Sequence, residues 1–275
     1  MRAAIIQTTS GIDPAANVHD LVQALAKAAG EGAEMAFTPE MCGMLDGKTA
    51  RIREKAVTEA DDPVLAAVRQ AAASHGLWVH LGSLALKEEG ADRLVNRGFV
   101  IDADGEIRAR YDKIHLFDVD LPSGERYRES ATYRAGERAD MAETPWFRMG
   151  MSICYDVRFA GLYQQLTDAG ATLLSVPAAF TATTGEAHWH VLLRARAIEA
   201  GVFVVAAAQT GRHEDGRSTY GHSLVIDPWG EVLLDMGTEP GVALCEIDMA
   251  QVEDVRGRVP AIRHRRRFSA PVQDR

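Results

Sequence analysis

An internal repeat constrains the fold of this chain more than any other feature. The segment Val100–Ile107 returns 125 positions later as Val225–Val232, and both contain Ile-Asp followed two residues on by Gly-Glu. Each copy is typical of a β-hairpin around a glycine-containing turn. The same offset aligns two further features, Gly76–Val79 with Gly201–Val204 and Arg69 with Arg194. The chain is therefore expected to fold as two similar halves.

Each half alternates strand-like and helix-like patterns. Two helices are expected to begin at Asp-Pro pairs, Asp13-Pro14 and Asp62-Pro63, because apolar residues follow each pair at helical spacing. The strand-like runs of the first half are Ala3–Gln7, Glu34–Thr38, Leu77–Leu86 and Gly98–Asp102. This alternation predicts an α/β protein. Two such sheets packed face to face, with helices outside, would form a four-layer α-β-β-α sandwich of two pseudo-repeated halves, because each sheet needs both faces covered.

Length and composition favour one domain over residues 1–275. The chain has 47% hydrophobic residues, enough for a large core. No run approaches the roughly 18 apolar residues of a membrane span, and the N-terminus starts directly with a strand-like pattern, so we expect a cytoplasmic protein without membrane association. The three cysteines are scattered and form no CxxC pair. Neither a disulfide framework nor a zinc site of that kind is predicted.

The charge of the chain bears on its partners. The formal net charge is -9, whereas nucleic-acid binding needs a basic surface, so nucleic acid is not expected as a partner. The basic cluster Arg263–Arg267 near the C-terminus is interpreted as an interface or a solvated terminus.

Three side chains with complementary chemistry follow predicted strands. Cys154 ends an apolar run and precedes a helix, Glu40 follows the strand-ending Pro39, and Lys113 follows the first hairpin in an apolar context. A thiol nucleophile, a carboxylate base and an ammonium group together suit acyl transfer. The ammonium is expected to favour the thiolate, and the N–H of Tyr155 is expected to be a second oxyanion donor.

Each of these residues also has an ordinary structural interpretation. A cysteine in an apolar strand is usually core filler, and a lone glutamate or lysine is usually solvated. His188 and His190 lie two positions apart, which is wrong for one helical face, so no metal site is predicted, and no cofactor is needed. The segment Arg110–Pro145 fits neither repeat, and polar insertions of this kind more often carry function than stability.

Several motifs, in order along the whole chain, resemble those of the nitrilase superfamily of carbon-nitrogen hydrolases. They are Thr38–Glu40, Tyr111–Asp118, Tyr127–Ser130 with Gly136, and Ser152–Phe159. The resemblance implies Glu40 as general base, Lys113 as oxyanion stabiliser and Cys154 as nucleophile. It also implies a second acidic residue beside them, which matches Glu129, and a doubled sandwich that agrees with the repeat.

Motifs in the second half are similar to the Nit branch of that superfamily. They are Phe180–Trp189, Leu193–Glu199, Ala206–Gly211 and Tyr220–Ser223. The implied substrate is deaminated glutathione or a similar 2-oxo acid amide. Residues expected to bind it are Tyr155, Arg158, Phe180, Thr181 and Glu186, and Arg158 could hold a carboxylate through two hydrogen bonds or form a structural ion pair instead. The stretch Met41–Gly47 differs from Nit members and is expected to line the pocket.

Other functions with the same three residues stay open at this point. The chain could be an omega-amidase, an N-carbamoyl amine hydrolase or an aliphatic amidase. It could also be a non-catalytic binding relative, which is disfavoured because all three residues are present. The resemblance further implies a homodimer or a higher homo-oligomer.

Overall fold

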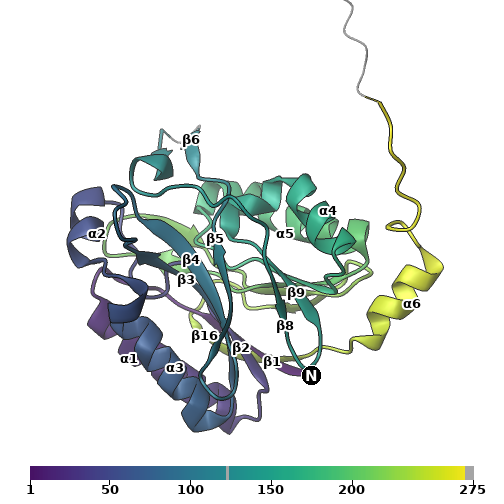
Figure 1. Ribbon diagram of the computed structural model, residues 1–275, viewed down its shortest axis with the longest axis horizontal. Helices are drawn as coiled ribbons and strands as arrows, with labels where there is room; N and C mark the ends of the chain where they lie inside the picture. The colour runs from purple at the N-terminus through teal and green to yellow at the C-terminus, as the bar shows by residue number, and fades with distance from the viewer. Residues whose placement is uncertain (122–123, 270–275) are drawn as a thin grey trace, which may run out of the picture.

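The computed structural model describes residues 1–121 and 124–269, and these form two stacked sheets with helices on the outer faces. In Figure 1, α1 (Pro14–Gly30) and α3 (Pro63–His75) lie on one side, while α4 (Ala160–Asp168) and α5 (Ala182–Ala200) lie on the other. Contacts of α1 with β16 and of α3 with β3, and of α4 with β9 and of α5 with β11, agree with this view. The four-layer sandwich of two similar halves is confirmed.

Twelve of the described strands form two six-stranded sheets of matching layout. The first has the order β16-β1-β2-β3-β4-β5 and the second β15-β14-β11-β10-β9-β8. The first-sheet strands are β1 (Arg2–Gln7), β2 (Met35–Phe37), β3 (Trp78–Leu86), β4 (Val95–Ile101), β5 (Ile107–Asp112) and β16 (Gly241–Glu246). The second-sheet strands are β8 (Met141–Glu143), β9 (Arg148–Met151), β10 (Leu173–Ser175), β11 (Phe203–Ala206), β14 (Leu224–Ile226) and β15 (Val232–Asp235).

The pairing of the strands confirms the 125-residue repeat. Val79 lies opposite Ile101 in the first sheet, and Val204 lies opposite Ile226 in the second. The two arginines related by the repeat, Arg69 and Arg194, also make equivalent hydrogen bonds. Arg69 Nε donates to the carbonyl of Gly105 at 2.7 Å, and Arg194 Nε donates to the carbonyl of Gly230 at 2.8 Å. Each arginine thus ties a helix to the turn of the hairpin in its own half.

Helix starts follow the sequence signals. The carboxylate of Asp13 accepts a hydrogen bond from the N–H of Ala15, and that of Asp62 accepts one from Leu65, so both predicted N-caps are present. In each case proline occupies the start of the helix, where its missing N–H leaves no bond unmade. The remaining helices are α2 (Thr49–Lys55) and α6 (Ala250–Arg258), with short 3-10 helices η1 (Glu59–Asp61), η2 (Glu129–Ala131) and η3 (Cys154–Arg158).

Alternate residues of the first sheet face two different cores. Ala3 and Ile5 of β1 pack into the layer between the sheets, whereas Ala4 and Ile6 pack against the outer helices. Side chains of a strand point alternately to opposite faces, so a strand covered on both sides is apolar throughout. This explains the continuous apolar runs in the sequence.

Two features of the fold were not predicted. The strand β16, near the C-terminal end, pairs antiparallel with β1 and completes the first sheet, and α6 follows it. Two hairpins, β6 (Asp118–Asp120) with β7 (Arg126–Arg128) and β12 (Thr210–Arg212) with β13 (Ser218–Tyr220), stand outside the main sheets. The first hairpin belongs to the predicted insertion.

The basic cluster near the C-terminus contacts the second half. The Arg265 guanidinium hydrogen-bonds the carbonyl of Gln164, pairs with Asp168 and donates to Thr167 Oγ1, all on α4. Among the described residues, no helix is both long and apolar enough to cross a membrane.

Candidate active site

Glu40 lies three residues beyond the end of β2 and is buried, with 4% of its surface exposed. Proline at position 39 has no N–H for a sheet hydrogen bond, so the chain leaves the strand there. Three donors converge on the Glu40 carboxylate. Asn96 Nδ2 and Lys113 Nζ both donate to Oε1 at 2.9 Å, and the N–H of Ala179 donates to Oε2 at 2.8 Å. The carboxylate is therefore fixed from both halves of the molecule.

Lys113 follows β5 and is buried, with 2% of its surface exposed. Its backbone N–H donates to the carbonyl of Asn96 at 2.9 Å. Its ammonium lies between two carboxylates, 2.9 Å from Glu40 Oε1 and 3.0 and 2.9 Å from the two oxygens of Glu129. A buried ammonium is stable only when paired in this way.

Glu129 begins η2 and is the second carboxylate that pairs with Lys113. The N–H of Phe117 donates to its Oε2 at 2.6 Å, and Asn96 Nδ2 contacts its Oε1 at 3.3 Å. Asn96 thus bridges both carboxylates, an arrangement that the sequence analysis did not predict.

Cys154 follows β9 as the first residue of η3, and its backbone is in the left-handed region with a φ of 50°. A non-glycine residue there carries local strain, and such residues are concentrated at functional sites. The N–H of Cys154 donates to the carbonyl of Pro177 at 2.9 Å, which holds the strained turn in place. The thiol also lies close enough to the Glu40 carboxylate for each group to shift the pKa of the other.

Asp156 joins the cysteine turn to the lysine segment. Its fully buried carboxylate accepts hydrogen bonds from Tyr111 OH at 2.7 Å, from the N–H of His115 at 3.0 Å and from the N–H of Ile153 at 2.8 Å. His115 Nδ1 lies 2.7 Å from the same carboxylate. Because Tyr111 and His115 flank Lys113 and Ile153 precedes Cys154, this one carboxylate fixes the spacing of both groups. In the sequence, the only hint of this role for Asp156 was its position two residues after Cys154.

The surroundings of the site shift the pKa values of Glu40 and Cys154 in opposite directions. Burial alone would raise the pKa of Glu40, but the Lys113 ammonium and the hydrogen bonds it receives hold that pKa below its ordinary value. Burial, together with the Glu40 carboxylate, raises the pKa of the Cys154 thiol well above its ordinary value, and Lys113 opposes this only in part. The Lys113 ammonium thus favours the thiolate, as expected, but burial and the Glu40 carboxylate outweigh it, so the thiol holds its proton more tightly than a free cysteine does.

The protonated form of Lys113 is strongly favoured. Burial favours the neutral amine, but the Glu129 and Glu40 carboxylates raise the pKa of Lys113 well above its ordinary value. A lysine held in this state supplies a fixed positive charge for developing negative charge, and it does not act as a proton donor at neutral pH.

A cavity of about 440 Å³ opens beside these groups and is lined by Glu40, Lys113, Glu129 and Cys154. Three of the residues predicted to bind substrate line it as well, namely Tyr155, Phe180 and Thr181. The hairpins β6–β7 and β12–β13 also contribute to the lining. As expected, most of the stretch Met41–Gly47 lines the cavity, through Met41, Met44, Leu45, Asp46 and Gly47.

Arg158 and Glu186 lie elsewhere and are not among the lining residues. The Arg158 guanidinium lies 5.9 Å from the Tyr155 ring centroid and 5.4 Å from that of Phe180, and its Nη2 contacts His188 Nδ1 at 3.3 Å. Arg158 therefore packs against two residues of the cavity wall, and these contacts are not the structural ion pair that the sequence analysis had left open. Glu186 is exposed on α5.

The profile of the carbon-nitrogen hydrolase family matches residues 2–257. The chain therefore belongs to this family, and it is an enzyme of the class that cleaves carbon-nitrogen bonds. It is 40% identical to a deaminated glutathione amidase of Yersinia enterocolitica over 98% of this chain and 94% of the relative.

Two solved structures show the same fold. The NitFhit protein of C. elegans superposes with a TM-score of 0.90 at 40% identity over 96% of this chain and 65% of that longer chain. An amidase from Nesterenkonia sp. AN1, whose structure shows Michael addition of acrylamide at the active site cysteine, gives a TM-score of 0.79 at 27% identity over 94% of this chain and 98% of that one.

Proposed function

We propose that this enzyme hydrolyses a linear amide through a thioester on Cys154. The observation that carries the proposal is the buried arrangement at the cavity wall, in which one carboxylate, Glu40, contacts both the thiol and the ammonium. Acyl transfer needs a nucleophile, a base within hydrogen-bond reach and a fixed positive charge, and these are the groups present.

The thiol proton has a defined route in this mechanism. As the sulfur of Cys154 bonds to the amide carbon, Glu40 takes the thiol proton and delivers it to the leaving nitrogen as the carbon-nitrogen bond breaks. A water molecule then attacks the thioester, Glu40 accepts one of its protons and returns it to the sulfur, and the carboxylic acid leaves. Glu40 therefore acts twice, as base and as acid, and its lowered pKa keeps it ionised before each cycle begins.

Lys113 and the N–H of Tyr155 stabilise the oxyanion of both tetrahedral intermediates. The three protons of the ammonium face Glu40 and the two oxygens of Glu129. Lys113 therefore stabilises the oxyanion through its charge at a distance, or it turns one N–H from a carboxylate toward the substrate oxygen when that oxygen becomes negative. Glu129 is proposed to position Lys113, because it contacts the ammonium with both oxygens.

Deaminated glutathione, or another short 2-oxo acid amide, is the proposed substrate. The support is the deaminated glutathione amidase of Yersinia enterocolitica, which matches nearly the whole chain. Arg126, Arg128 and Arg217 are also among the lining residues of the cavity. Each already pairs with an aspartate, so a substrate carboxylate would have to share these guanidinium groups. Tyr155, Phe180 and Thr181 are proposed to contact the substrate from the wall beside Cys154.

The test compares three amides. Purified enzyme would be incubated with deaminated glutathione, α-ketoglutaramate and an N-carbamoyl amino acid, and product release would be measured for each. Turnover of the first that is lost in Cys154→Ala and kept in Cys245→Ala supports both the chemistry and the substrate. Turnover of another amide alone would reject the substrate but retain the mechanism, whereas turnover that survives Cys154→Ala would reject the mechanism.

A homodimer, or a higher homo-oligomer, is proposed as the working form. The support is a group of exposed apolar residues on and beside α5, where Val191 is 69% exposed, Ile198 52% and Trp229 61%. Exposed large apolar groups gathered in one region are typical of interfaces. Light scattering should give at least twice the chain mass, and Ile198→Glu should lower it; a monomeric wild type would reject the proposal.

A reducing compartment such as the cytoplasm is proposed for the enzyme. Cys42, Cys154 and Cys245 are all free, and the proposed reaction needs a free thiol at Cys154. Cell fractionation would test this, and recovery of the enzyme from an oxidising compartment would contradict it.

A further inference from the structure

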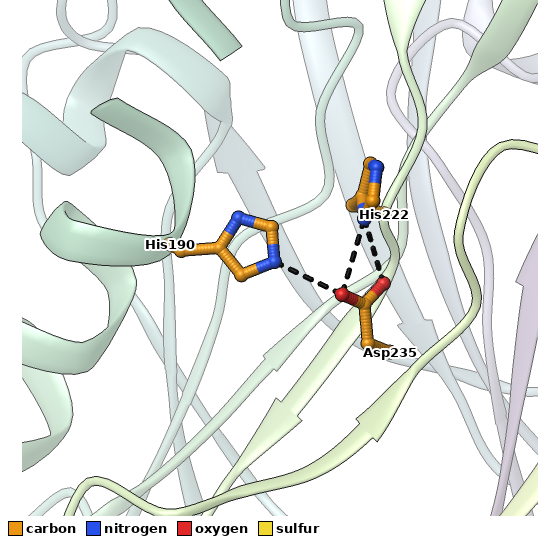
Figure 2. A group of neighbouring side chains, drawn as sticks. All are labelled: His190, His222 and Asp235. Carbon is orange, nitrogen blue, oxygen red and sulfur yellow. Dashed lines mark hydrogen bonds and ion pairs between the residues drawn. The ribbon is translucent and has the colours of Figure 1, made fainter. Parts of the chain in front are cut away.

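A second group of chemically active side chains lies outside the cavity. His190, His222 and Asp235, here called the His-Asp-His cluster, converge on one point at the surface of the second half (Figure 2). His190 Nε2 lies 3.0 Å from one oxygen of Asp235, and His222 Nδ1 lies 2.8 Å from the other. Both imidazole rings point at the same carboxylate. None of the three residues lines the proposed active site.

The three residues come from separate elements that the fold holds in place. His190 belongs to α5, Asp235 ends β15, and His222 lies in the link between β13 and β14. His222 has a φ of 51°, a left-handed conformation that few residues other than glycine adopt. Its N–H donates to the carbonyl of Gly237 at 2.6 Å and its carbonyl accepts from Trp189 Nε1 at 2.8 Å. Strain maintained by two backbone hydrogen bonds is typical of a functional position.

We propose that the His-Asp-His cluster binds a divalent transition metal, with Zn²⁺ as the ion that suits it best. Two imidazole nitrogens and a carboxylate oxygen are ligands that zinc favours, and all the ligand atoms lie within 4.8 Å of one another. Three protein ligands leave one tetrahedral position for water. The side chains are 33%, 23% and 34% exposed, so an ion can reach them from solvent.

Metal binding at the cluster needs a free lone pair on the ring nitrogens that face Asp235. Without metal, these nitrogens, Nε2 of His190 and Nδ1 of His222, lie within hydrogen-bond distance of the carboxylate. With metal, each ring carries its proton on the other nitrogen, and the nitrogen facing Asp235 donates its lone pair to the ion. The N–H of Gly237 donates to Asp235 Oδ1 at 2.9 Å, and the Tyr220 ring stacks on His222 at 4.5 Å. These contacts keep two ligands oriented, as outer partners do at known metal sites.

The experiment uses the untagged full chain carrying Cys154→Ala, so that the proposed nucleophile does not bind metal. Zinc would be titrated against a chromophoric chelator. We expect one Zn²⁺ per chain, bound at least tenfold more weakly by His190→Ala, by Asp235→Asn and by His222→Asn. Asparagine tolerates the left-handed backbone at position 222, so that variant removes the ligand with little added strain. Cobalt should give d–d absorption bands that the same variants lose.

His188→Ala is the matched control, since His188 lies two residues away on α5 and does not face the cluster. It should bind zinc like the parent protein. Circular dichroism and the metal-free melting temperature of each variant verify that the fold is kept. Zinc affinity unchanged in all three cluster variants, or lost equally in His188→Ala, would overturn the proposal, as would the absence of zinc binding by the parent protein. None of these outcomes depends on amidase activity.

Discussion

The two halves of this enzyme share a frame but differ in chemistry at equivalent strand ends. Ile5 of β1 pairs with Phe37 of β2, and Met151 of β9 pairs with Ser175 of β10, which aligns the two sheets residue by residue. In this alignment Glu40 of the first half corresponds to Ala178 of the second, and Cys154 corresponds to Thr8. Each half thus contributes one reactive group, and the equivalent position in the other half is inert toward acyl transfer.

This division explains why neither half suffices for the site. The N–H of Ala179, next to the counterpart of Glu40, donates to the Glu40 carboxylate, and the N–H of Cys154 donates to the carbonyl of Pro177. The strand end that lacks a reactive side chain supplies backbone groups that hold the reactive ones. A pseudo-symmetric frame therefore brings a base and a nucleophile together because their strands end at one rim, and sequence divergence makes them different.

Replacing the base tests the assignment most strongly. Glu40→Gln keeps the shape of the side chain but cannot accept the thiol proton, so kcat/KM should fall by about 10²- to 10⁴-fold. Glu137→Gln, at an exposed glutamate, is the matched control and should keep full activity. Steady-state kinetics on the identified amide would measure both, and equal activity in the two variants would mean that the first half supplies no base.

The pH profile of kcat/KM should reflect the lowered pKa of Glu40 and the raised pKa of Cys154. Glu40 must be ionised, and its lowered pKa means that activity is lost only as pH falls below the ordinary glutamate range. The remaining proton of the pair belongs to Cys154, whose raised pKa places the alkaline limb above the ordinary thiol range. Rates should therefore stay level across neutral pH and fall about tenfold per unit on each limb. A limb near pH 7 would contradict the electrostatics described for the site.

Removing the buried cation should destabilise the fold. Lys113→Met leaves Glu40 and Glu129 without their shared ammonium, which should lower the free energy of unfolding by about 3–5 kcal/mol at neutral pH. Acid should narrow the deficit, because protonated carboxyls no longer need the cation. Lys87→Met, at an exposed lysine, should stay within about 0.5 kcal/mol of wild type. Denaturant titration at two pH values measures both, and an unchanged midpoint for Lys113→Met would show that the ion cluster is not needed for stability.

The repeated hairpin turns offer a finer comparison between the halves. Gly105 and Gly230 both have left-handed backbones, with φ of 79° and 89°, so alanine should cost roughly 1–2 kcal/mol at either. A Cβ at Gly105 would lie 2.5 Å from the carbonyl oxygen of Arg69, whereas one at Gly230 would meet the half-exposed side chain of Ile198. Backbone cannot move aside as a side chain can, so Gly105→Ala should lose about 1–3 kcal/mol more. Equal unfolding free energies would refute this difference.

The sequence alone determined the frame. The 125-residue repeat predicted two similar halves, and the Asp-Pro pairs predicted two helix starts. These predictions succeed because periodicity and turn signals act within short segments of the chain. Glu40, Lys113 and Cys154 were singled out by their contexts together with the resemblance to the nitrilase superfamily, and their roles stay predictions.

Only the tertiary structure decided the contacts between distant segments. It places β16 beside β1, brings Asn96 between Glu40 and Glu129, and ties His115 and Ile153 to Asp156. It also shows that burial and a neighbouring carboxylate raise the pKa of the Cys154 thiol more than the ammonium lowers it. The His-Asp-His cluster is of the same kind, since its members come from three elements and share no motif. Distances between residues far apart in the chain are set by packing, and no spacing in the sequence encodes them.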